Sequence, residues 1–374
     1  MKIYPSSACP DRLPPSGGRR ALMLMSGGVD STVAAWLLKR EGWQLAGLTM
    51  AIPGQGGPEG SAVREGVAAA EALSIPHYIA ELEEEFKDLV IDPFASEYLS
   101  GRTPNPCARC NAKLKLGLLW DVAEEILGSA ALATGHYARV FHIDGRPALA
   151  RGVDPDKDQS YFLYGIKRDR LSGLLLPLGD FDKDAVRTMA AEAGLSAAEK
   201  KDSMEICFAQ EGGYRQLLEE KPREPGMILD EEGNILGRHG GISGFTVGQK
   251  RGHGIASPKG LYVLEINGER NTITLGPRER AFRSVVEAGE INILLPDALT
   301  EGAELFGKTR SRGEPAPLKI LKAGDGRITV RFKEPQFAPA PGQCLVIYTR
   351  EGLVAGGGVI DRSSSEDCPA GGKS

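Results

Sequence analysis

The feature that most constrains the fold is an apolar run, a glycine-rich loop and a helical pattern, in that order, near the start of the chain. Residues 21–25 read ALMLM, which is typical of a buried strand. SGGVDST follows at 26–32, and apolar residues then recur at helical spacing over 31–41. GWQLAGLTM at 42–50 predicts the next strand. Because parallel strands need a crossover, this unit favours a parallel pair of strands joined by a helix.

The alternation continues to about residue 200. SAVREGVAAAEALS predicts a helix, HYIAEL a strand and ALATG a further strand. Between the last two, a helix predicted to begin near Asn111 places Leu114, Leu118, Val122 and Ile126 on one face. Strand and helix in alternation predict an α/β fold, a Rossmann-like parallel sheet covered on both faces.

Beyond Cys207 the pattern becomes rich in β-strands. LYVLEINGERNTITLG contains an Asn-Gly turn between two strand-like runs, and LKILKAGDGRITVRF and CLVIYTREGLVAGGGVI repeat the strand–turn–strand order. These runs predict a small C-terminal antiparallel β-barrel. The expected organisation is a disordered tail over 1–19, an α/β domain over 20–207, a linker domain over 208–284, the barrel over 285–362 and a disordered tail over 363–374.

Composition limits the classes of function. No apolar run approaches the length of a membrane span, so we expect no membrane partner and a cytoplasmic location, where thiols stay reduced. Six cysteines then indicate chemistry or packing rather than a disulfide framework. The net charge of −5 is not that of a dedicated nucleic-acid binder, so binding RNA would require a local basic surface.

The loop at residues 26–31, here called the phosphate loop, predicts a polyphosphate site. Gly27 and Gly28 allow the backbone to approach a ligand closely, and the following helix N-terminus favours negative charge. Asp30 is placed to hold a magnesium ion that bridges phosphate oxygens. The loop does not match GxxxxGK[ST], so it is not a Walker motif.

The segment NPCARCNAKLK carries two cysteines, Cys107 and Cys110. Cys110 is expected at the N-terminus of the helix that begins near Asn111, where the helix dipole and the nearby Lys113 and Lys115 would favour a thiolate. A zinc site would need four ligands, for which His136 is a candidate together with Cys207. A redox pair, a cluster site and a nucleophile with a helper also remain open.

Several motifs occur in a fixed order: GRTPNPCARCNAKLKLG, LATGHYAR, DKDQSYFL, KKDSMEICF and GFTVGQKRGHGI, after SGGVDST. Together they resemble the tRNA-specific 2-thiouridylases of bacteria and mitochondria, which belong to the PP-loop ATP pyrophosphatases. The resemblance runs from about residue 20 to 362. It implies a PP-loop domain, a linker domain and a C-terminal β-barrel. The implied activity is ATP-dependent 2-thiolation of the wobble uridine of tRNA anticodons, a tRNA-uridine 2-sulfurtransferase reaction that proceeds by adenylation of the C2 oxygen.

The resemblance also implies roles for particular residues. Cys110 matches the family's catalytic cysteine and Cys207 its persulfide-bearing cysteine. Nucleotide contacts fall on Ser26, Gly27, Gly28, Val29, Asp30, Ser31, Met50 and Gly135. Contacts to the target base fall on Asn105, Pro106 and Cys107, and contacts to tRNA on Lys157, Asp158, Gln159, Arg310 and Ser311. The implied cofactors are ATP and magnesium, and the implied partners are tRNA and a sulfur donor, either a cysteine desulfurase or a sulfur relay protein.

Cys107 departs from one branch of the family, which has Asp at this position, and it leaves two schemes open. In the first, Cys207 carries a persulfide and Cys110 closes a disulfide with it. In the second, Cys107, Cys110 and Cys207 ligate three irons of a 4Fe–4S cluster. A spectator thiol beside a persulfide would invite exchange, which favours the cluster. Two smaller departures are Ser311, where the family often has Tyr, and Lys250, where Arg is common.

Two other functions are compatible with the sequence. One is another PP-loop adenylating ligase, which acts on a small carboxylate or carbonyl compound. The other is a non-catalytic iron–sulfur or redox-sensing RNA-binding protein that keeps ATP as a structural ligand. Release of pyrophosphate that requires tRNA separates the first function from the thiouridylase, and formation of AMP separates the second.

Overall fold

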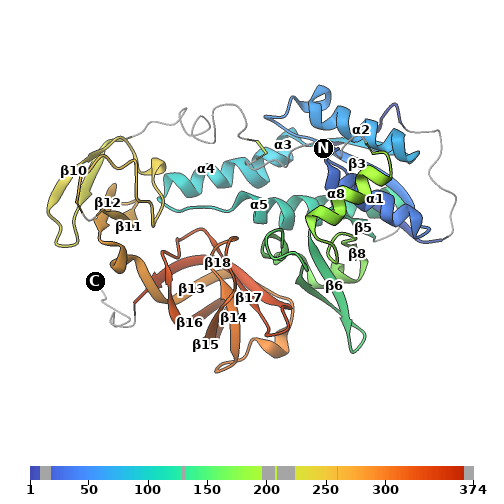
Figure 1. Cartoon of the computed structure of the whole chain (residues 1–374). Helices are drawn as coiled ribbons and strands as arrows, with labels where there is room; N and C mark the ends of the chain where they lie inside the picture. Colours follow the sequence, from blue (N-terminus) through green and yellow to red (C-terminus); the bar gives the residue numbers. More distant parts are fainter. Residues whose placement is uncertain (9–17, 129–130, 196–206, 209–223, 259, 366–374) are drawn as a thin grey trace. The chain divides into compact units, whose positions relative to one another are not determined.

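A computed structural model describes residues 1–8, 18–128, 131–195, 207–208, 224–258 and 260–365 (Figure 1). The chain divides into two compact units. The first consists of Met1–Ile91, Cys107–Gly213 and Gly352–Val354, and the second of Asp92–Pro106, Tyr214–Glu351 and Ala355–Ser374. Asp92–Pro106 therefore group with the second unit, although the sequence assigns them to the α/β domain.

A six-stranded sheet forms the centre of the first unit. Its strands, in spatial order, are β1 (Lys2–Pro5), β4 (His77–Glu81), β3 (Gln44–Ala51), β2 (Arg20–Leu24), β5 (Leu132–Ala133) and β8 (Leu174–Leu175). All neighbours pair in parallel except β1, which runs antiparallel to β4 at the edge. The predicted parallel sheet is confirmed. The expected disordered tail is wrong for Lys2–Pro5, because these residues form β1; residues 9–17 lie outside the described part.

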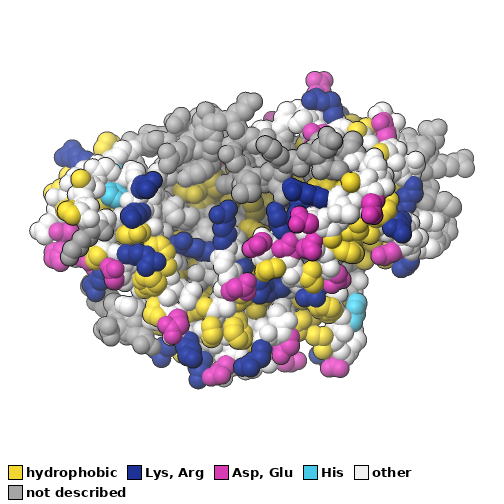
Figure 2. Space-filling model, viewed as in Figure 1, with side chains coloured by type: hydrophobic (Ala, Val, Ile, Leu, Met, Phe, Trp, Pro, Cys, Tyr) yellow, Lys and Arg dark blue, Asp and Glu magenta, His cyan; other side chains and the backbone are white. Residues whose placement is uncertain are grey.

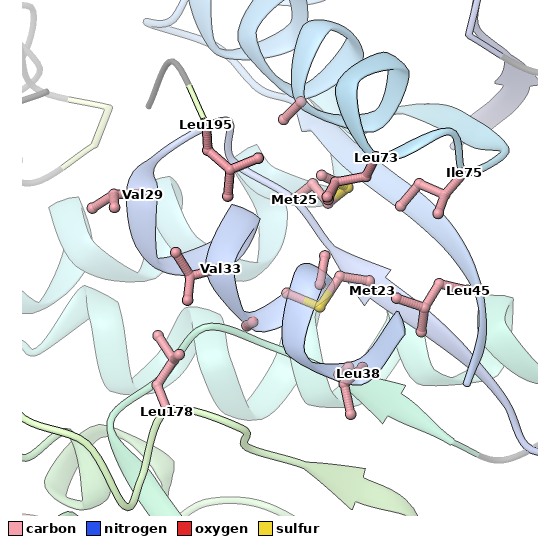
Figure 3. Close-up of a cluster of buried hydrophobic side chains, with 14 of the residues drawn as sticks. Met23, Met25, Val29, Val33, Leu38, Leu45, Leu73, Ile75, Leu178 and Leu195 are labelled. Atoms are coloured by element: carbon pink, nitrogen blue, oxygen red, sulfur yellow. The ribbon is translucent and has the colours of Figure 1, made fainter. Parts of the chain in front are cut away.

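Three helices pack on one core of this unit: α1 (Val29–Arg40), α2 (Ser61–Leu73) and α8 (Lys183–Glu192). Val29, Val33 and Leu38 of α1 belong to one buried cluster with strand residues such as Met23, and Figure 3 labels these side chains. Each fully buried aliphatic side chain of this kind stabilises the fold by about 1.5–3 kcal/mol. The packing fixes α1 so that its N-terminus follows directly on β2.

The strand order places the phosphate loop at the switch point of the sheet. From β2 the chain adds β3 and β4 on one side, and β5 and β8 later add to the other side. The carboxyl ends of β2 and β5 are therefore neighbours, and α/β sheets bind ligands in the crevice at such a point. The phosphate loop follows β2, and Gly135 follows β5.

The cysteine-containing helix starts earlier than predicted. Helix α5 (Pro106–Arg109) leads without a break into the π-helix η3 (Cys110–Leu118) and then α6 (Leu119–Leu127). Proline is favoured at the first position of a helix, because its missing N–H has no partner there in any case. The predicted start near Asn111 is therefore wrong, and Cys110 lies within the helical stretch.

The remaining elements of the first unit are shorter. They are the 3₁₀-helix η1 (Gly57–Glu59), α3 (Glu83–Phe86), the π-helix η2 (Lys87–Ile91), the antiparallel hairpin β6 (Ala138–Ile143) and β7 (Arg146–Arg151), α7 (Ser160–Leu163) and the 3₁₀-helix η4 (Arg168–Gly173).

The second unit holds α4 (Asp92–Leu99) and two β-structures. A four-stranded sheet has the order β10 (Ile235–His239), β9 (Gly226–Leu229), β12 (Thr272–Gly276) and β11 (Tyr262–Asn267), and the predicted Asn-Gly turn joins β11 to β12. The 3₁₀-helices η6 (Ile242–Gly244), η7 (Arg278–Ala281) and η8 (Pro296–Ala298) connect its parts. Ile228, Val263 and Ile273 form the centre of a separate small core.

The predicted C-terminal β-barrel is confirmed. It is closed, in the order β13 (Phe282–Ile293), β16 (Arg327–Phe337), β15 (Ala316–Gly324), β14 (Glu304–Lys308), β17 (Cys344–Tyr348) and β18 (Val354–Ser364). Alternate residues such as Ile328, Val330 and Phe332 fill its interior. Cys344 is buried in β17, as expected of a packing residue.

The described surface carries charges of both signs. Figure 2 shows basic and acidic side chains interspersed over the visible face. Among the described residues, no helix has the length and apolar character needed to cross a membrane.

Candidate functional site: a phosphate loop and three cysteines

The phosphate loop has a backbone that only glycine can form at one position. Gly27 has φ +70°, and a Cβ there would lie 2.3 Å from Cβ of Glu65 on α2. Gly28 is the N-cap of α1, and no side chain caps this end of the helix. The first amides of a helix have no partner within the helix, so this end offers donors to an anion.

Two serines brace the phosphate loop from within, and Gly135 packs against it from the segment after β5. Ser31 Oγ donates to the carbonyl of Gly28 at 3.2 Å, and Ser26 Oγ lies 3.3 Å from Ser31 Oγ, so the two hydroxyls brace the turn. A Cβ on Gly135 would lie 2.8 Å from backbone atoms of Asp30 and Ser31. The segment after β5 can therefore touch the loop only because residue 135 is glycine. Met50 is half-buried near the end of β3.

Asp30 binds two side chains that sequence reasoning missed. Its Oδ1 accepts from Tyr137 Oη at 2.7 Å, and Lys183 Nζ donates to its two oxygens at 2.8 and 2.9 Å. Lys183 is 153 positions away from Asp30 in the chain, and no local sequence pattern indicates that the two residues meet. The Asp30 side chain is still 34% exposed. Its carboxylate suits magnesium, which prefers oxygen ligands, but an internal cation already neutralises it.

The two cysteines of the CxxC pair differ in environment. Cys107 is exposed in α5, whereas Cys110 is buried in η3 with 7% of its surface accessible. Burial raises the pKa of Cys110 to about 11; Lys115 opposes this shift, and Cys207 and Cys107 add to it. The expectation that Cys110 is a ready thiolate is therefore wrong for this structure. The helix begins at Pro106, so its N-terminal dipole does not act at residue 110, and desolvation outweighs the cation.

Cys207 is half-buried, and two side chains from earlier in the sequence hold its segment in place. Gln55 Nε2 donates to the carbonyl of Cys207 at 3.1 Å, and the Phe208 ring packs edge-on against Phe86 at 5.6 Å. Burial raises the pKa of the Cys207 thiol; Lys115 lowers it, and Cys107 raises it further. The three cysteines are thus near enough to act on one another electrostatically.

Lys115 is the shared neighbour of this site. It lies five residues after Cys110, and in a π-helix residues five apart lie near the same face, because each turn holds more residues than in an α-helix. Besides the thiols, it acts on His136, whose pKa is lowered to about 3 by burial first and by Lys115 second. His136 is therefore neutral at physiological pH. Its Nδ1 lies 2.8 Å from Thr134 Oγ1.

The described residues contain no group of three or more His, Cys, Asp or Glu side chains arranged to hold a metal ion. Cys107, Cys110 and Cys207 are all described, so in this structure they are not gathered as a ligand set. The same holds for a zinc site that uses His136.

The predicted tRNA segment at 157–159 is partly structural. The Asp158 carboxylate is fully buried and accepts from Arg151 Nε and from the amides of Gly152 and Ser160, each at 3.1 Å. Gln159 Oε1 accepts from the Tyr137 amide at 3.0 Å. The Asp158 carboxylate is therefore part of the fold, and the contact of this segment with tRNA stays a prediction for Lys157, for Gln159 and for the backbone.

In the second unit, Arg310 stands in a group of cations and aromatic rings. It is exposed, donates to the carbonyl of Ala338 at 2.9 Å and lies 5.5 Å from the Phe337 ring. Exposed Arg278 lies 5.0 Å from the same ring, and exposed Lys250 lies 5.8 Å from Tyr262, which packs against Phe337. Ser311 is half-buried beside Arg310. Asn105 and Pro106, also in this unit, directly precede Cys107 in the chain.

Three family models match consecutive parts of the chain. One described as a tRNA methyl transferase HUP domain matches residues 19–211, a tRNA methyl transferase PRC-barrel domain matches 215–277, and an aminomethyltransferase beta-barrel domain matches 283–360. The tRNA-specific 2-thiouridylase MnmA of Geotalea uraniireducens is 43% identical over 361 residues, which are 92% of this chain and 96% of that protein. The chain belongs to the tRNA-specific 2-thiouridylase family.

Other thiouridylases agree over similar lengths. The MnmA protein of Geobacter metallireducens is 41% identical, and the match covers 93% of this chain and 98% of that protein. The MnmA protein of Clostridioides difficile is 39% identical, and the match covers 92% of this chain and 99% of that protein. The descriptions of two of the family models mention tRNA methyl transferases, whereas these curated relatives, which match nearly the whole chain, are all named as thiouridylases.

Proposed function

We propose that this protein is an ATP-dependent tRNA-uridine 2-sulfurtransferase that thiolates the wobble uridine. The observation that carries the proposal is that one compact unit holds both the phosphate loop and the three neighbouring cysteines. A uracil C2 oxygen is a poor leaving group, so the reaction needs ATP to activate it and a sulfur nucleophile to replace it. For the same reason we propose residues 20–91 and 107–207 as the catalytic part of the chain, followed by the linker domain and by the barrel, whose strands run from Phe282 to Ser364.

The first step is adenylation of the base. The C2 oxygen of uridine attacks the α-phosphorus of ATP, the bond to the β-phosphate breaks, and pyrophosphate leaves. The phosphate loop and the N-terminus of α1 bind the phosphates, and the close contact of Gly135 with the loop completes the cradle. Asp30 would hold magnesium, which supplies positive charge against the phosphate oxygens.

The second step moves sulfur. The terminal sulfur of a Cys207 persulfide attacks C2, the C2–O bond breaks, and AMP leaves with the electron pair. The Cys110 thiolate then attacks Sγ of Cys207, breaks the S–S bond and leaves the sulfur on C2, so that a Cys110–Cys207 disulfide forms. An external thiol reductant restores both thiols, and a persulfide-bearing sulfur donor protein reloads Cys207. Because the Cys110 thiol has a raised pKa, it needs a base or a rearranged environment to form its thiolate.

The iron–sulfur scheme remains the alternative source of sulfur. Three cysteine thiolates can hold a 4Fe–4S cluster with one open iron. The described residues do not present the three cysteines as a ligand set, so a cluster does not fit this arrangement. We therefore place the persulfide scheme first, in contrast to the preference drawn from sequence, and leave the choice to an iron measurement.

For tRNA binding we propose Lys157 in the first unit and the Arg310 surface in the second. Cations stacked on aromatic rings suit RNA, because they can pair with phosphates and stack on bases. Arg310, Arg278 and Lys250 all lie on one aromatic group. This local basic surface accounts for RNA binding by a chain of net charge −5.

The test is release of pyrophosphate and AMP from ATP by the purified protein with and without tRNA. We expect release that requires tRNA containing an unmodified wobble uridine, and loss of this release in Asp30→Ala. Release stimulated by a small carboxylate instead of tRNA would favour an adenylating ligase. Binding of ATP and tRNA with no AMP formed would favour a non-catalytic RNA-binding protein.

A further inference from the structure

We propose that Lys183 is a phosphate-binding residue whose ammonium group contacts the phosphates beyond the α-phosphate of the nucleotide. Asp30 and Tyr137 hold it beside the phosphate loop before the nucleotide binds. The inference rests on the proposed function only in taking the ligand to be a nucleoside triphosphate.

Lys183 is held in place by its backbone. It is the first residue of α8 (Lys183–Glu192), where Asp182 caps the helix by accepting from the Ala185 amide at 2.7 Å. The Lys183 amide itself donates to Asp154 Oδ2 at 3.1 Å. The residue is 7% exposed. A lysine is almost never this buried without a specific partner, so its ammonium position is part of the fold.

The partner is the phosphate loop itself. Lys183 Nζ lies 2.8 and 2.9 Å from the two oxygens of Asp30, the second residue of α1, and 5.8 Å from the centre of the Tyr137 ring. Tyr137 Oη donates to the same carboxylate at 2.7 Å. The cation therefore lies next to the uncapped N-terminus of α1, where backbone donors for an anion are already present.

The charge of the loop explains why a cation is needed there. SGGVDST contains no lysine or arginine, and its only charged side chain is the negative Asp30. A Walker loop carries its own lysine for the outer phosphates, whereas here the chain supplies one from a helix 153 positions away. Lysine suits the task, because it acts as a point charge toward phosphate oxygens.

A simpler reading is that the ion pair only joins α8 to α1. Two features favour the binding role. The Asp30 side chain is 34% exposed, so the pair is not sealed in the core. In addition, a carboxylate in a polyphosphate site repels its ligand unless a cation remains beside it.

The experiment compares nucleotides that differ in their outer phosphates. Binding of ATP, inorganic pyrophosphate and AMP is measured by calorimetry in EDTA, so that no metal contributes. We expect Lys183→Met to weaken the binding of ATP and of pyrophosphate by about 10- to 100-fold, which is the range for loss of a hydrogen bond to a charged group. The binding of AMP should weaken by less than about threefold. Exposed Lys167→Met is the matched control and should change none of the three.

Equal loss for AMP and ATP, or no loss for either, would overturn the proposal in favour of a structural ion pair. The melting temperature of each variant monitors folding. If Lys183→Met does not fold, the ratio of ATP to AMP affinity in Lys183→Arg decides, since a changed ratio supports phosphate contact and an unchanged one contradicts it. A wild-type protein that binds ATP through Lys183 but releases no pyrophosphate with tRNA would refute the proposed function and leave this inference intact.

Discussion

Replacing Gly135 by alanine should weaken ATP binding while the rest of the fold stays intact. A Cβ at this position would lie 2.8 Å from the Asp30 carbonyl carbon and the Ser31 nitrogen, and 3.0 Å from the Asp30 oxygen. These are backbone atoms of the phosphate loop, so they cannot rotate away as a flexible side chain could. Overpacking of this kind costs about 1–3 kcal/mol. If the loop shifts to relieve the strain and ATP must restore it, the Kd for ATP rises by about 5- to 150-fold.

The assay is ATP titration by calorimetry together with thermal unfolding. Gly324→Ala is the matched control, because a Cβ there meets nothing within 4 Å and its backbone is not left-handed. We expect the control to bind ATP as the wild type does. Gly135→Ala with wild-type affinity would refute the claim that the segment after β5 and the phosphate loop form one nucleotide cradle.

Three further predictions concern the thiols and the RNA surface. With a pKa of about 11, Cys110 should be about 0.1% thiolate at pH 8, whereas an ordinary thiol is about a quarter thiolate. The rate of Cys110 alkylation, measured by peptide mass spectrometry, should therefore rise about tenfold per pH unit up to about pH 11. A rate that reaches a plateau near about pH 8.5 would contradict the effect of burial on this thiol. Arg310→Ala should weaken tRNA binding and reduce the salt slope by about one, whereas Arg362→Ala, whose guanidinium pairs with Glu287, should leave the slope unchanged. Under the persulfide scheme, protein purified without oxygen should be colourless, and Cys107→Ser should still thiolate tRNA. If the wild type holds about four irons per chain and Cys107→Ser loses them, the cluster scheme is established instead.

Local patterns predicted much of this fold. The apolar run of β2, the glycines of the phosphate loop and the periodicity of α1 are adjacent in sequence, so their physical meaning could be inferred without knowledge of the rest. The barrel was predicted for the same reason, since its strands alternate and its turns carry glycine.

The errors arose where distant segments meet. The Cys110 thiolate was inferred from a helix start near Asn111, but the helix begins at Pro106, and packing around Cys110 decides its pKa. The burial of the Asp158 carboxylate was not predicted, because it depends on Arg151 and on amides that only the folded loop brings together. Lys183 could not be found at all, because only the packing of α8 beside α1 brings it to Asp30.

The most direct test of the account is mass analysis of tRNA nucleosides from cells that lack this protein and from the same cells complemented with wild type or with Cys207→Ser. The account predicts that 2-thiouridine derivatives at the wobble position disappear without the protein, return with the wild type and remain absent with Cys207→Ser. Undiminished wobble 2-thiouridine in the cells that lack the protein would contradict the proposed function, and full recovery with Cys207→Ser would contradict the role of Cys207 in both sulfur schemes.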